Sequence, residues 1–596
     1  MTVGPIPDVP ASDAQTRNHS RWAAWSRAHA VGLWACLLTF LILAPVLAPG
    51  YVLSYDMNFV PKQIPLPWMA GLGGGLPRAV PQDLVVALLS GPLPGQLLQK
   101  LALFGALIGA GMGVGRILRR HSLFAALLGA TLAIWNPFVV ERLVLGHWSL
   151  LISYAAVPWL LAAVQAVRQG SHDSALRLVV IVAIGSLVPS GGVVMAVLAL
   201  PALMWGSALG MSRRIALGGA IALINLTWVL PALLNANSVV SDPRGVAVFA
   251  LHSESWGGLL VTALGGGGAW NGEVVPSSRS LPWIPVVAIV FAALAVVGFR
   301  QLCAWLGRAA TWALAGTAGV GLAAGVLGAW SVTQQSVTRI ITDIPGGGIL
   351  RDGQKLLIPL VVLIALAAPL GLERVIRKFR APSAARQLAL AMVLALPILA
   401  MPDAVWGVAG RLSPVSYPVG WSEVRATMAA GAPGDAVSLP WAQFRRYPWN
   451  AKRTVLDPAP RFMTRTVITD DSLLVNANGT LVKVGGDDPR SAQVGAALES
   501  GAPLSSQLPS LGVRWVIEQT DQPTVTDPKD LVGMKLAVQT PGLRLWEAPG
   551  EVVEQEAMAF GFFVYLIDVI AALLVLAAGA SLATRVRKHR HSGAHE

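Results

Sequence analysis

The sequence contains little cysteine and little charge, and both shortages restrict what the protein can be. Only two cysteines occur among 596 residues, Cys36 inside an apolar run and Cys303 in a segment rich in arginine. These positions belong to different environments, so no disulfide framework is expected. Charged residues make up 13% of the chain, whereas 54% of it is hydrophobic and the mean hydropathy is +0.60. Such a composition excludes an ordinary soluble protein and predicts a polytopic membrane protein.

Acidic residues are scarcer than basic ones, which gives a net charge of +13 and a pI of about 10.2. A charge of this size can indicate nucleic-acid binding. Here, however, the basic residues gather at the ends of the apolar runs, which is typical of membrane topology and not of a binding stripe. We therefore expect no nucleic-acid partner.

Many apolar runs are long enough to span a bilayer, since about 17 to 25 helical residues cross its hydrocarbon core. Twelve candidate spans lie near 31–49, 96–116, 122–138, 149–167, 176–191, 193–210, 215–234, 281–298, 309–330, 354–371, 387–402 and 559–584. The two runs around Ser190, Gly191 and Gly192 could also form one long broken helix.

Basic residues recur in alternate connections between these runs, and the positive-inside rule places such clusters in the cytoplasm. Twelve spans with both termini in the cytoplasm satisfy this pattern, whereas eleven spans would not. The predicted order is a cytoplasmic tail (1–30), a transmembrane core of eleven helices (31–402), an extracytoplasmic domain (403–558), a last span (559–584) and a basic cytoplasmic tail (585–596).

The block at 403–558 differs from the rest of the chain in composition. Acidic residues appear in it, and short strand-like runs such as V-R-W-V-I-E and L-R-L-W-E lie between turn-rich segments. A segment of roughly 150 residues can bury its own core. We predict a small α/β domain that precedes the last helix.

The predicted outer loops are 50–95, 139–148, 235–280 and 331–353. The first begins G-Y-V-L-S-Y-D-M-N-F-V-P-K-Q, which places Asp56 and Lys62 where the first span ends. The run at 81–92 is too short to cross the membrane and is typical of an interfacial helix.

Two further loops carry polar side chains next to spans. The segment N-P-F-V-V-E-R-L-V-L-G-H-W at 136–148 contains Glu141, Arg142 and His147. The segment R-D-G-Q-K, at the start of the tenth span, contributes Arg351 and Lys355. A carboxylate can take a proton from a sugar hydroxyl, while guanidinium and ammonium groups can hold a departing phosphate. Glycosyl transfer from a lipid phosphate needs both functions.

Five features of the sequence form one arrangement. They are the many spans, Y-D-M in the first outer loop, the interfacial helix, R-D-G-Q-K in a late outer loop and the carboxy-terminal outer domain. It resembles the GT-C superfamily of integral-membrane glycosyltransferases. The resemblance implies a polyprenyl-phosphate sugar donor, with Asp56 as the general base and Arg351, Lys355 and Lys62 at the donor phosphate.

High alanine, glycine, valine and arginine content is similar to that of high-GC actinobacteria. The resemblance therefore points to arabinofuranosyl- or mannosyltransferases of such envelopes, which would act in the bacterial plasma membrane on a glycan or glycolipid acceptor. Members that use a metal often carry paired acids, but Asp56 stands alone in its segment. No cofactor is predicted, a divalent metal included.

Each of these residues also has a purely structural interpretation. Asp56 could mark the membrane boundary, and Arg351 and Lys355 could anchor a span at the lipid headgroups. Glu141 and Arg142 could form an ion pair or contact donor or acceptor. His147 could bond locally or contact a substrate.

The outer domain offers one further candidate surface. The segment L-P-W-A-Q-F-R-R-Y-P-W-N at 439–450 combines aromatic and cationic residues, a mixture that can stack on sugar rings and reach their hydroxyls. Its possible acceptor contacts are Trp441, Arg445, Arg446 and Tyr447. The same residues could instead dock the domain on the membrane core.

Two other classes of protein remain open. A lipid or glycan flippase can have twelve spans, but we expect such a protein to show intramembrane charges and two related halves, and neither is evident. A non-catalytic scaffold for envelope assembly would also explain the outer domain and would need neither Asp56 nor Arg351.

Overall fold

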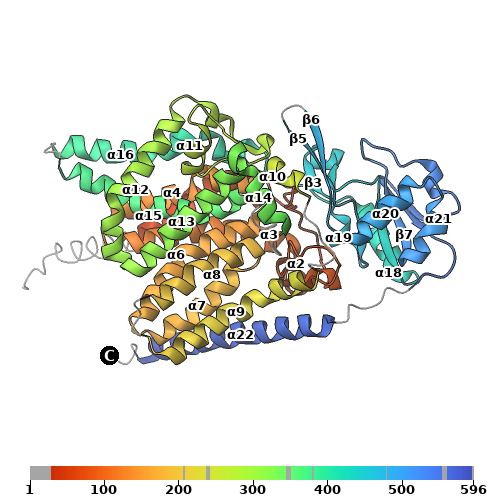
Figure 1. The fold of residues 1–596 in the computed structure, drawn as a ribbon, viewed down its shortest axis with the longest axis horizontal. Coiled ribbons are helices and arrows are strands. Elements are labelled where there is room, and N and C mark those ends of the chain that lie inside the picture. The colour runs from red at the N-terminus through yellow and green to blue at the C-terminus, as the bar shows by residue number, and fades with distance from the viewer. Residues whose placement is uncertain are drawn as a thin grey trace, which may run out of the picture.

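The computed structural model describes residues 29–205, 209–235, 242–343, 351–378, 382–477, 480–553 and 560–592. It consists of a helical bundle and an α/β domain that lies against one end of the bundle (Figure 1). The predicted tail at 1–30 falls outside these residues except for its last two. Of the predicted tail at 585–596, the residues up to Ser592 continue the last helix.

Helices form at all twelve predicted apolar runs. They are the span His29–Leu47, α3 (Gly95–Leu118), α4 (Leu123–Ile134), α6 (Trp148–Arg168), α7 (His172–Gly185), α8 (Pro189–Met204), α9 (Met211–Leu234), α12 (Ile284–Leu306), α13 (Arg308–Ala329), α15 (Ile358–Ile376), α16 (Ser383–Ala400) and α22 (Gly561–Ser592). Among the described residues, nine helices are long and apolar enough to cross a membrane, or ten if α16 and the bent segment after it form one span.

The polytopic helical fold is therefore confirmed, while the count of twelve spans stays a prediction. The two short members are α7 with 14 residues and α8 with 16, fewer than the roughly 20 that usually cross a bilayer. The chain breaks between them at 186–188, just before the predicted division, because Pro189 suits the first turn of a new helix.

Two of the predicted outer loops contain helices of eight or more residues that the sequence did not indicate. Within 139–148 lies most of α5 (Pro137–Val144), whose amino end is fixed when the Asn136 side chain accepts a hydrogen bond from Val139 N at 2.9 Å. Asn before Pro is a common start of a helix. Within 331–353 lies α14 (Ser331–Asp343). The predicted interfacial helix at 81–92 is present as α2 (Gln82–Leu89).

Small residues let the spans approach closely. A side chain on Gly298 of α12 would lie 2.0 Å from the Ala367 carbonyl oxygen, and one on Gly371 of α15 would lie 1.9 Å from that of Leu294. Such contacts between glycines and backbone are typical of helices packed in membranes. The last helix, α22, runs beside α7 and α9 (Figure 1).

The predicted α/β domain is also confirmed. Its sheet has the order β4-β1-β7-β9-β8. The strands are β1 (Asp435–Leu439), β4 (Val467–Ile468), β7 (Val513–Gln519), β8 (Lys535–Thr540) and β9 (Leu543–Glu547). The first three are mutually parallel, and β9 and β8 continue the sheet antiparallel.

Helices cover both faces of this sheet. Successive residues of a strand point to opposite faces. Thus Ala436 packs with α18 (Val419–Ala430), whereas Val437 packs with α20 (Pro489–Glu499) and α21 (Leu504–Gln507).

Two hairpins connect the domain to the bundle. They are β2 (Phe444–Arg446) with β3 (Thr454–Leu456), and β5 (Leu473–Ala477) with β6 (Thr480–Val484). The second hairpin shares a small apolar cluster with α10 (Arg244–Val248) and Phe249 of the bundle. We call residues 403–558 the outer domain; the side of the membrane on which it lies stays a prediction.

Candidate functional site

Asp56 lies in a tight turn that the end of α5 supports. Tyr55 has a φ of 44°, in the left-handed region, and Met57 N donates to the Ser54 carbonyl at 2.8 Å. Asp56 N donates to Leu145 O at 3.1 Å. A side chain on Gly146 would lie 2.0 Å from Met57 N, so only glycine allows this approach.

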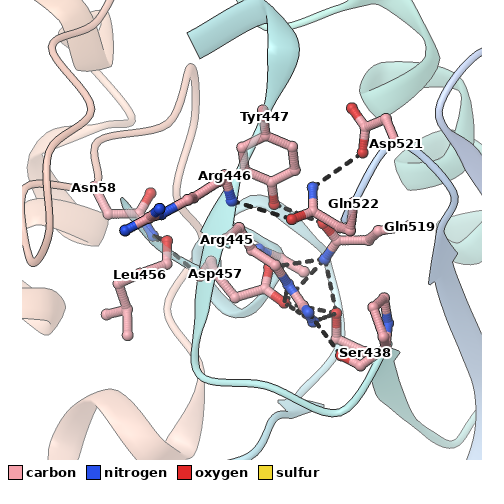
Figure 2. Close-up of polar contacts among 12 residues, drawn as sticks. Asn58, Ser438, Arg445, Arg446, Tyr447, Leu456, Asp457, Gln519, Asp521 and Gln522 are labelled. Carbon is pink, nitrogen blue, oxygen red and sulfur yellow. Dashed lines mark hydrogen bonds and ion pairs between the residues drawn. The ribbon is translucent and has the colours of Figure 1, made fainter. Parts of the chain in front are cut away.

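The outer domain holds the same turn from the other side. Tyr55 N donates to Thr454 O at 2.7 Å, and Leu456 N donates to Tyr55 O at 2.8 Å. The Asn58 amide donates to Leu456 O at 3.0 Å (Figure 2). Tyr55 Oη donates to Glu273 Oε2 at 2.6 Å. The position of Asp56 therefore depends on both parts of the molecule.

Asp56 is paired with His147. The distance from His147 Nε2 to Asp56 Oδ2 is 3.1 Å, and the Asp56 side chain remains 49% exposed while that of His147 is 11% exposed. On the other side of the ring, Arg142 Nη1 lies 3.1 Å from His147 Nδ1. A guanidinium group can only donate, so Nδ1 accepts, and the ring proton is on Nε2, pointing at Asp56.

The third predicted segment completes this cluster. Arg142 Nη2 donates to Gln354 Oε1, and the next residue, Lys355, forms an ion pair with Asp352 at 2.8 Å. Gly353 lies so close to α13 that a side chain there would be 2.5 Å from the Ala324 carbonyl oxygen. The three outer segments that the sequence suggested do meet.

Charges around the pair set its protonation. Burial favours the neutral form of Asp56, but the hydrogen bond from His147 and the charges of His147, Lys355 and Arg461 together lower its pKa below the usual value. For His147, burial and the charge of Lys355 outweigh Asp56 and lower the pKa. At neutral pH the site therefore holds an aspartate and a neutral imidazole.

Several polar atoms here are buried without a hydrogen-bond partner in the described part of the chain. They are Glu141 Oε1, Arg142 Nε, Asp352 Oδ1 and Gln354 Nε2. Buried polar groups nearly always have partners in folded proteins, so four such atoms on neighbouring residues need an explanation. A polar ligand would supply one.

The other predicted phosphate contacts lie elsewhere. The Arg351 guanidinium stacks on the Phe249 ring at 4.7 Å, and burial together with the nearby charge of Arg78 lowers its pKa to about 10, so it stays charged at neutral pH. Its other charged neighbours are Asp487, Asp352 and Asp242. Lys62 is exposed, and its amino group makes no hydrogen bond or ion pair with any residue that the structure describes.

Glu141 is fully buried, and its contact with a donor or acceptor stays a prediction. Its side chain is 0% exposed, accepts a hydrogen bond from Ala269 N at 3.1 Å, and lies beside the carboxyl group of Glu254. Glu254 in turn pairs with Arg279 at 2.7 Å. The alternative, an ion pair with Arg142, is absent from the described residues, because the two side chains contact different partners.

The predicted acceptor surface at 439–450 is corrected in part. Arg445 and Tyr447 are 2% and 0% exposed, so neither can reach an acceptor. Arg445 binds Asp457 inside the domain, and Tyr447 Oη donates to Gln519 at 2.6 Å (Figure 2). Arg446, by contrast, is exposed and lies 3.9 Å from Glu273, the partner of Tyr55.

Sequence reasoning missed an ion pair that joins the two parts beside the site. Arg461 of the outer domain binds Asp83 of α2 at 2.8 Å, with both side chains nearly buried. These residues are distant in sequence, and only the fold brings them together. Gln354 was likewise assigned no role, although it lies within R-D-G-Q-K.

Metal binding has no obvious place in this arrangement. Within the described ranges, no group of three or more His, Cys, Asp or Glu side chains is placed to hold one metal ion. Metal independence stays a prediction.

No protein-family model matches the sequence, and no curated protein matches it. Solved structures do match. A cryo-EM structure of the arabinofuranosyltransferase AftD from Mycobacteria aligns with a TM-score of 0.51 and 15% identity, over 90% of this chain and 40% of that chain. A variant of AftD gives a TM-score of 0.50 with 17% identity, over 89% and 42%.

The chain thus spans about 40% of the length of the protein to which it is similar. At this level of identity the likeness concerns the fold. Together with the bundle, the outer domain and the helix that follows it, the likeness confirms the GT-C-like fold that the sequence suggested.

Proposed function

We propose that the protein transfers a sugar from a polyprenyl-phosphate donor to a glycan or glycolipid acceptor of the bacterial envelope. The observation that carries this proposal is the cluster in which an exposed aspartate is paired with a neutral histidine and the charge of a lysine from a third, distant segment acts on both. The GT-C fold, which it shares with a glycosyltransferase of known structure, supports the same conclusion.

Asp56 is the general base of the proposed reaction. Oδ2 is bonded to His147, so Oδ1 of this half-exposed carboxylate can accept the proton of an acceptor hydroxyl. As the hydroxyl oxygen attacks the anomeric carbon, the bond from that carbon to the phosphate oxygen breaks, and polyprenyl phosphate leaves with the electron pair. Because its pKa is lowered, Asp56 is ionised at neutral pH and can accept this proton.

His147 and Arg142 position the base. Arg142 fixes the histidine tautomer, and His147 N–H holds one carboxylate oxygen so that the other points outward. Neither residue has to gain or lose a proton during transfer. Their role is therefore orientation and charge balance, not catalysis in the strict sense.

Lys355 holds the donor phosphate in this proposal. It is 30% exposed, interacts electrostatically with Asp56, and stands at the start of a predicted span, where we expect the phosphate of a lipid donor to lie. An ammonium group stabilises the charge that develops on a leaving phosphate. Arg351 and Lys62 would form a second, outer set of cations along the path of the donor.

The test uses purified protein in lipid nanodiscs with polyprenyl-phosphate arabinose and mannose donors, an envelope glycan extract, and release of free polyprenyl phosphate as the readout. We expect Asp56→Asn to lose about 10²–10⁴-fold in rate, the usual contribution of a general base. The matched control is Asp343→Asn, which alters an exposed acid at the end of α14.

Asn can still accept the hydrogen bond from His147, so we expect the Asp56→Asn variant to fold. Its folding is measured in parallel. Equal release by the wild type and Asp56→Asn would rule out this base. Absence of release with every donor would favour the scaffold alternative.

A further inference from the structure

The outer domain contains a cavity of about 540 Å³ that the proposed reaction does not use. Binding sites for small ligands usually measure about 300–1,000 Å³. Its walls include residues just after β1 and β4, namely Pro440 and Trp441, and Asp470 and Asp471. The segment after β7 contributes Thr526. The cavity therefore lies at the carboxyl ends of the three parallel strands.

The order of the strands is the one that creates a ligand site in open α/β sheets. The chain runs from β1 to β4 on one side of β1 and later returns to β7 on its other side. Loops leave neighbouring strands in opposite directions at such a switch point and open a crevice, where open α/β sheets bind their ligands. The amino end of α20 borders the same cavity.

Charge restricts the class of ligand. The walls carry one lysine, Lys483, and six acidic residues: Asp470, Asp471, Asp488, Glu499, Asp527 and Asp530. A phosphate or carboxylate ligand would be repelled. Some of the acids are fixed in place, since Asp471 Oδ2 accepts from Asp488 N at 2.7 Å and Asp488 Oδ1 accepts from Arg490 N at 2.9 Å.

A second, independent feature points to a ligand with hydroxyl groups. Thr526 is one of the residues that line the cavity and is only 7% exposed, and its buried Oγ1 has no hydrogen-bond partner among the described residues. Trp441, which is partly exposed, stands in the same wall, and its indole lies over Gly495, where a side chain would come 3.5 Å from Nε1.

We propose that this cavity binds a neutral carbohydrate, with Trp441 against the sugar ring and the carboxylates and Thr526 bonded to its hydroxyls. Aromatic rings stack on the apolar faces of sugars, and carboxylates accept hydrogen bonds from adjacent hydroxyls. A neutral sugar meets both demands and, unlike an anion, is not repelled.

The role of this site rests on the proposed function: it would hold the acceptor glycan. A chain of charged residues leads from the cavity toward the proposed donor cations. Asp488 lines the cavity, and its sequence neighbour Asp487 forms an ion pair with Arg78. Arg78 in turn acts electrostatically on Arg351. A glycan anchored in the outer domain could extend along this route toward the cluster around Asp56.

Binding is measured by calorimetry on the full chain in nanodiscs, with short linear arabinofuranose and mannose oligosaccharides as probes and CaCl₂ alone as the cation probe. All titrations use the Asp56→Asn background, so that turnover cannot interfere. We expect Trp441→Ala and Thr526→Val each to weaken oligosaccharide binding about tenfold or more, a loss of about 1.4 kcal/mol. The controls are Trp330→Ala and Glu551→Gln, which alter exposed residues outside the cavity.

Thr526→Val keeps the side-chain shape and decides the question if Trp441→Ala does not fold. Unchanged affinity in Thr526→Val and Asp530→Asn overturns the proposal, as does absence of binding by every oligosaccharide. Calcium binding that Asp530→Asn abolishes, without sugar binding, overturns it in favour of a cation site. Sugar binding without any transferase activity of the wild type would leave this site standing and reject the proposed function alone.

Discussion

Arg142 and Arg445 are the least exposed of the buried arginines in the described part of the chain, and their surroundings differ. Arg445 in the outer domain bonds to Asp457 through Nε and one Nη atom, and its other Nη atom donates to Pro440 O at 2.6 Å (Figure 2). Arg142 in the bundle has no carboxylate within ion-pair distance in the described chain. It bonds to the neutral acceptors His147 and Gln354, and its Nε has no partner.

The difference separates a residue that holds a fold together from one that prepares a site. A buried charge with all its bonds made rigidifies its surroundings, and removing one partner leaves the other uncompensated. A buried charge with unused donors and no counter-ion is costly for the fold, and such costs are typical of functional sites. The two arginines should therefore respond differently to substitution.

The largest effect on stability is expected at the outer-domain arginine. Arg445→Ala leaves Asp457 buried and unpaired, which should reduce the free energy of unfolding by about 3–5 kcal/mol. Chemical denaturation followed by tryptophan fluorescence measures this. The control is the adjacent exposed Arg446→Ala, for which we expect a change within about 0.5 kcal/mol. A small effect of Arg445→Ala on stability would contradict the structural role that distinguishes Arg445 from Arg142.

Substitution of the bundle arginine should act on the reaction instead. Arg142→Met frees His147 to adopt the other tautomer, which turns an unprotonated nitrogen toward Asp56. We expect transfer to fall about 10–100-fold, as is usual when a residue that orients a functional histidine is lost. Arg142→Lys, which keeps a donor, should restore part of the rate. Equal rates for Met and Lys variants would contradict an orienting role.

The pH dependence of stability gives a further test of the pair formed by Arg142 and His147. Since the pKa of His147 is lowered from its usual 6.5, the folded protein binds fewer protons than the unfolded chain below that value. Stability contributed by the neutral ring is therefore present above pH 6.5 and is lost as the pH falls through the lower folded pKa. Protonation of His147 would also place an N–H on Nδ1, which faces the Arg142 guanidinium and could then no longer accept its hydrogen bond.

We expect the rate of transfer to fall over this same acidic window in the wild type. His147→Gln should be slower but should lack this step, retaining only the fall at still lower pH that follows protonation of Asp56. Rate measurements against pH for the two proteins test this. Identical profiles would exclude His147 as the titrating group.

The smallest effect is expected at Glu141. Burial and the nearby charge of Glu254 favour the protonated form of Glu141, and Gln can donate a hydrogen bond in its place. Glu141→Gln should change the free energy of unfolding by about 1 kcal/mol or less and leave transfer near the wild-type rate. A loss as large as that of Asp56→Asn would return Glu141 to the list of candidate bases.

Local sequence was enough to locate Asp56, His147 and Lys355, because each stands just outside an apolar run, where charged side chains are conspicuous. It was not enough at 439–450, where Arg445 and Tyr447 have the same residue types as an exposed binding surface. Burial there depends on Asp457 and Gln519, which are paired only after the sheet has formed. The helix α5 was missed because its signal, Asn136 before Pro137, adjoined the end of a span.

The sequence by itself determined the membrane setting, the approximate positions of the spans and the presence of an α/β domain, because hydropathy and strand periodicity act over neighbouring residues. Only the tertiary structure decided which polar side chains meet. The contacts between Asp56 and His147, between Arg142 and Gln354, and between Asp83 and Arg461 join residues that are far apart in the chain. Such contacts depend on how helices and domains pack, and no local pattern records them.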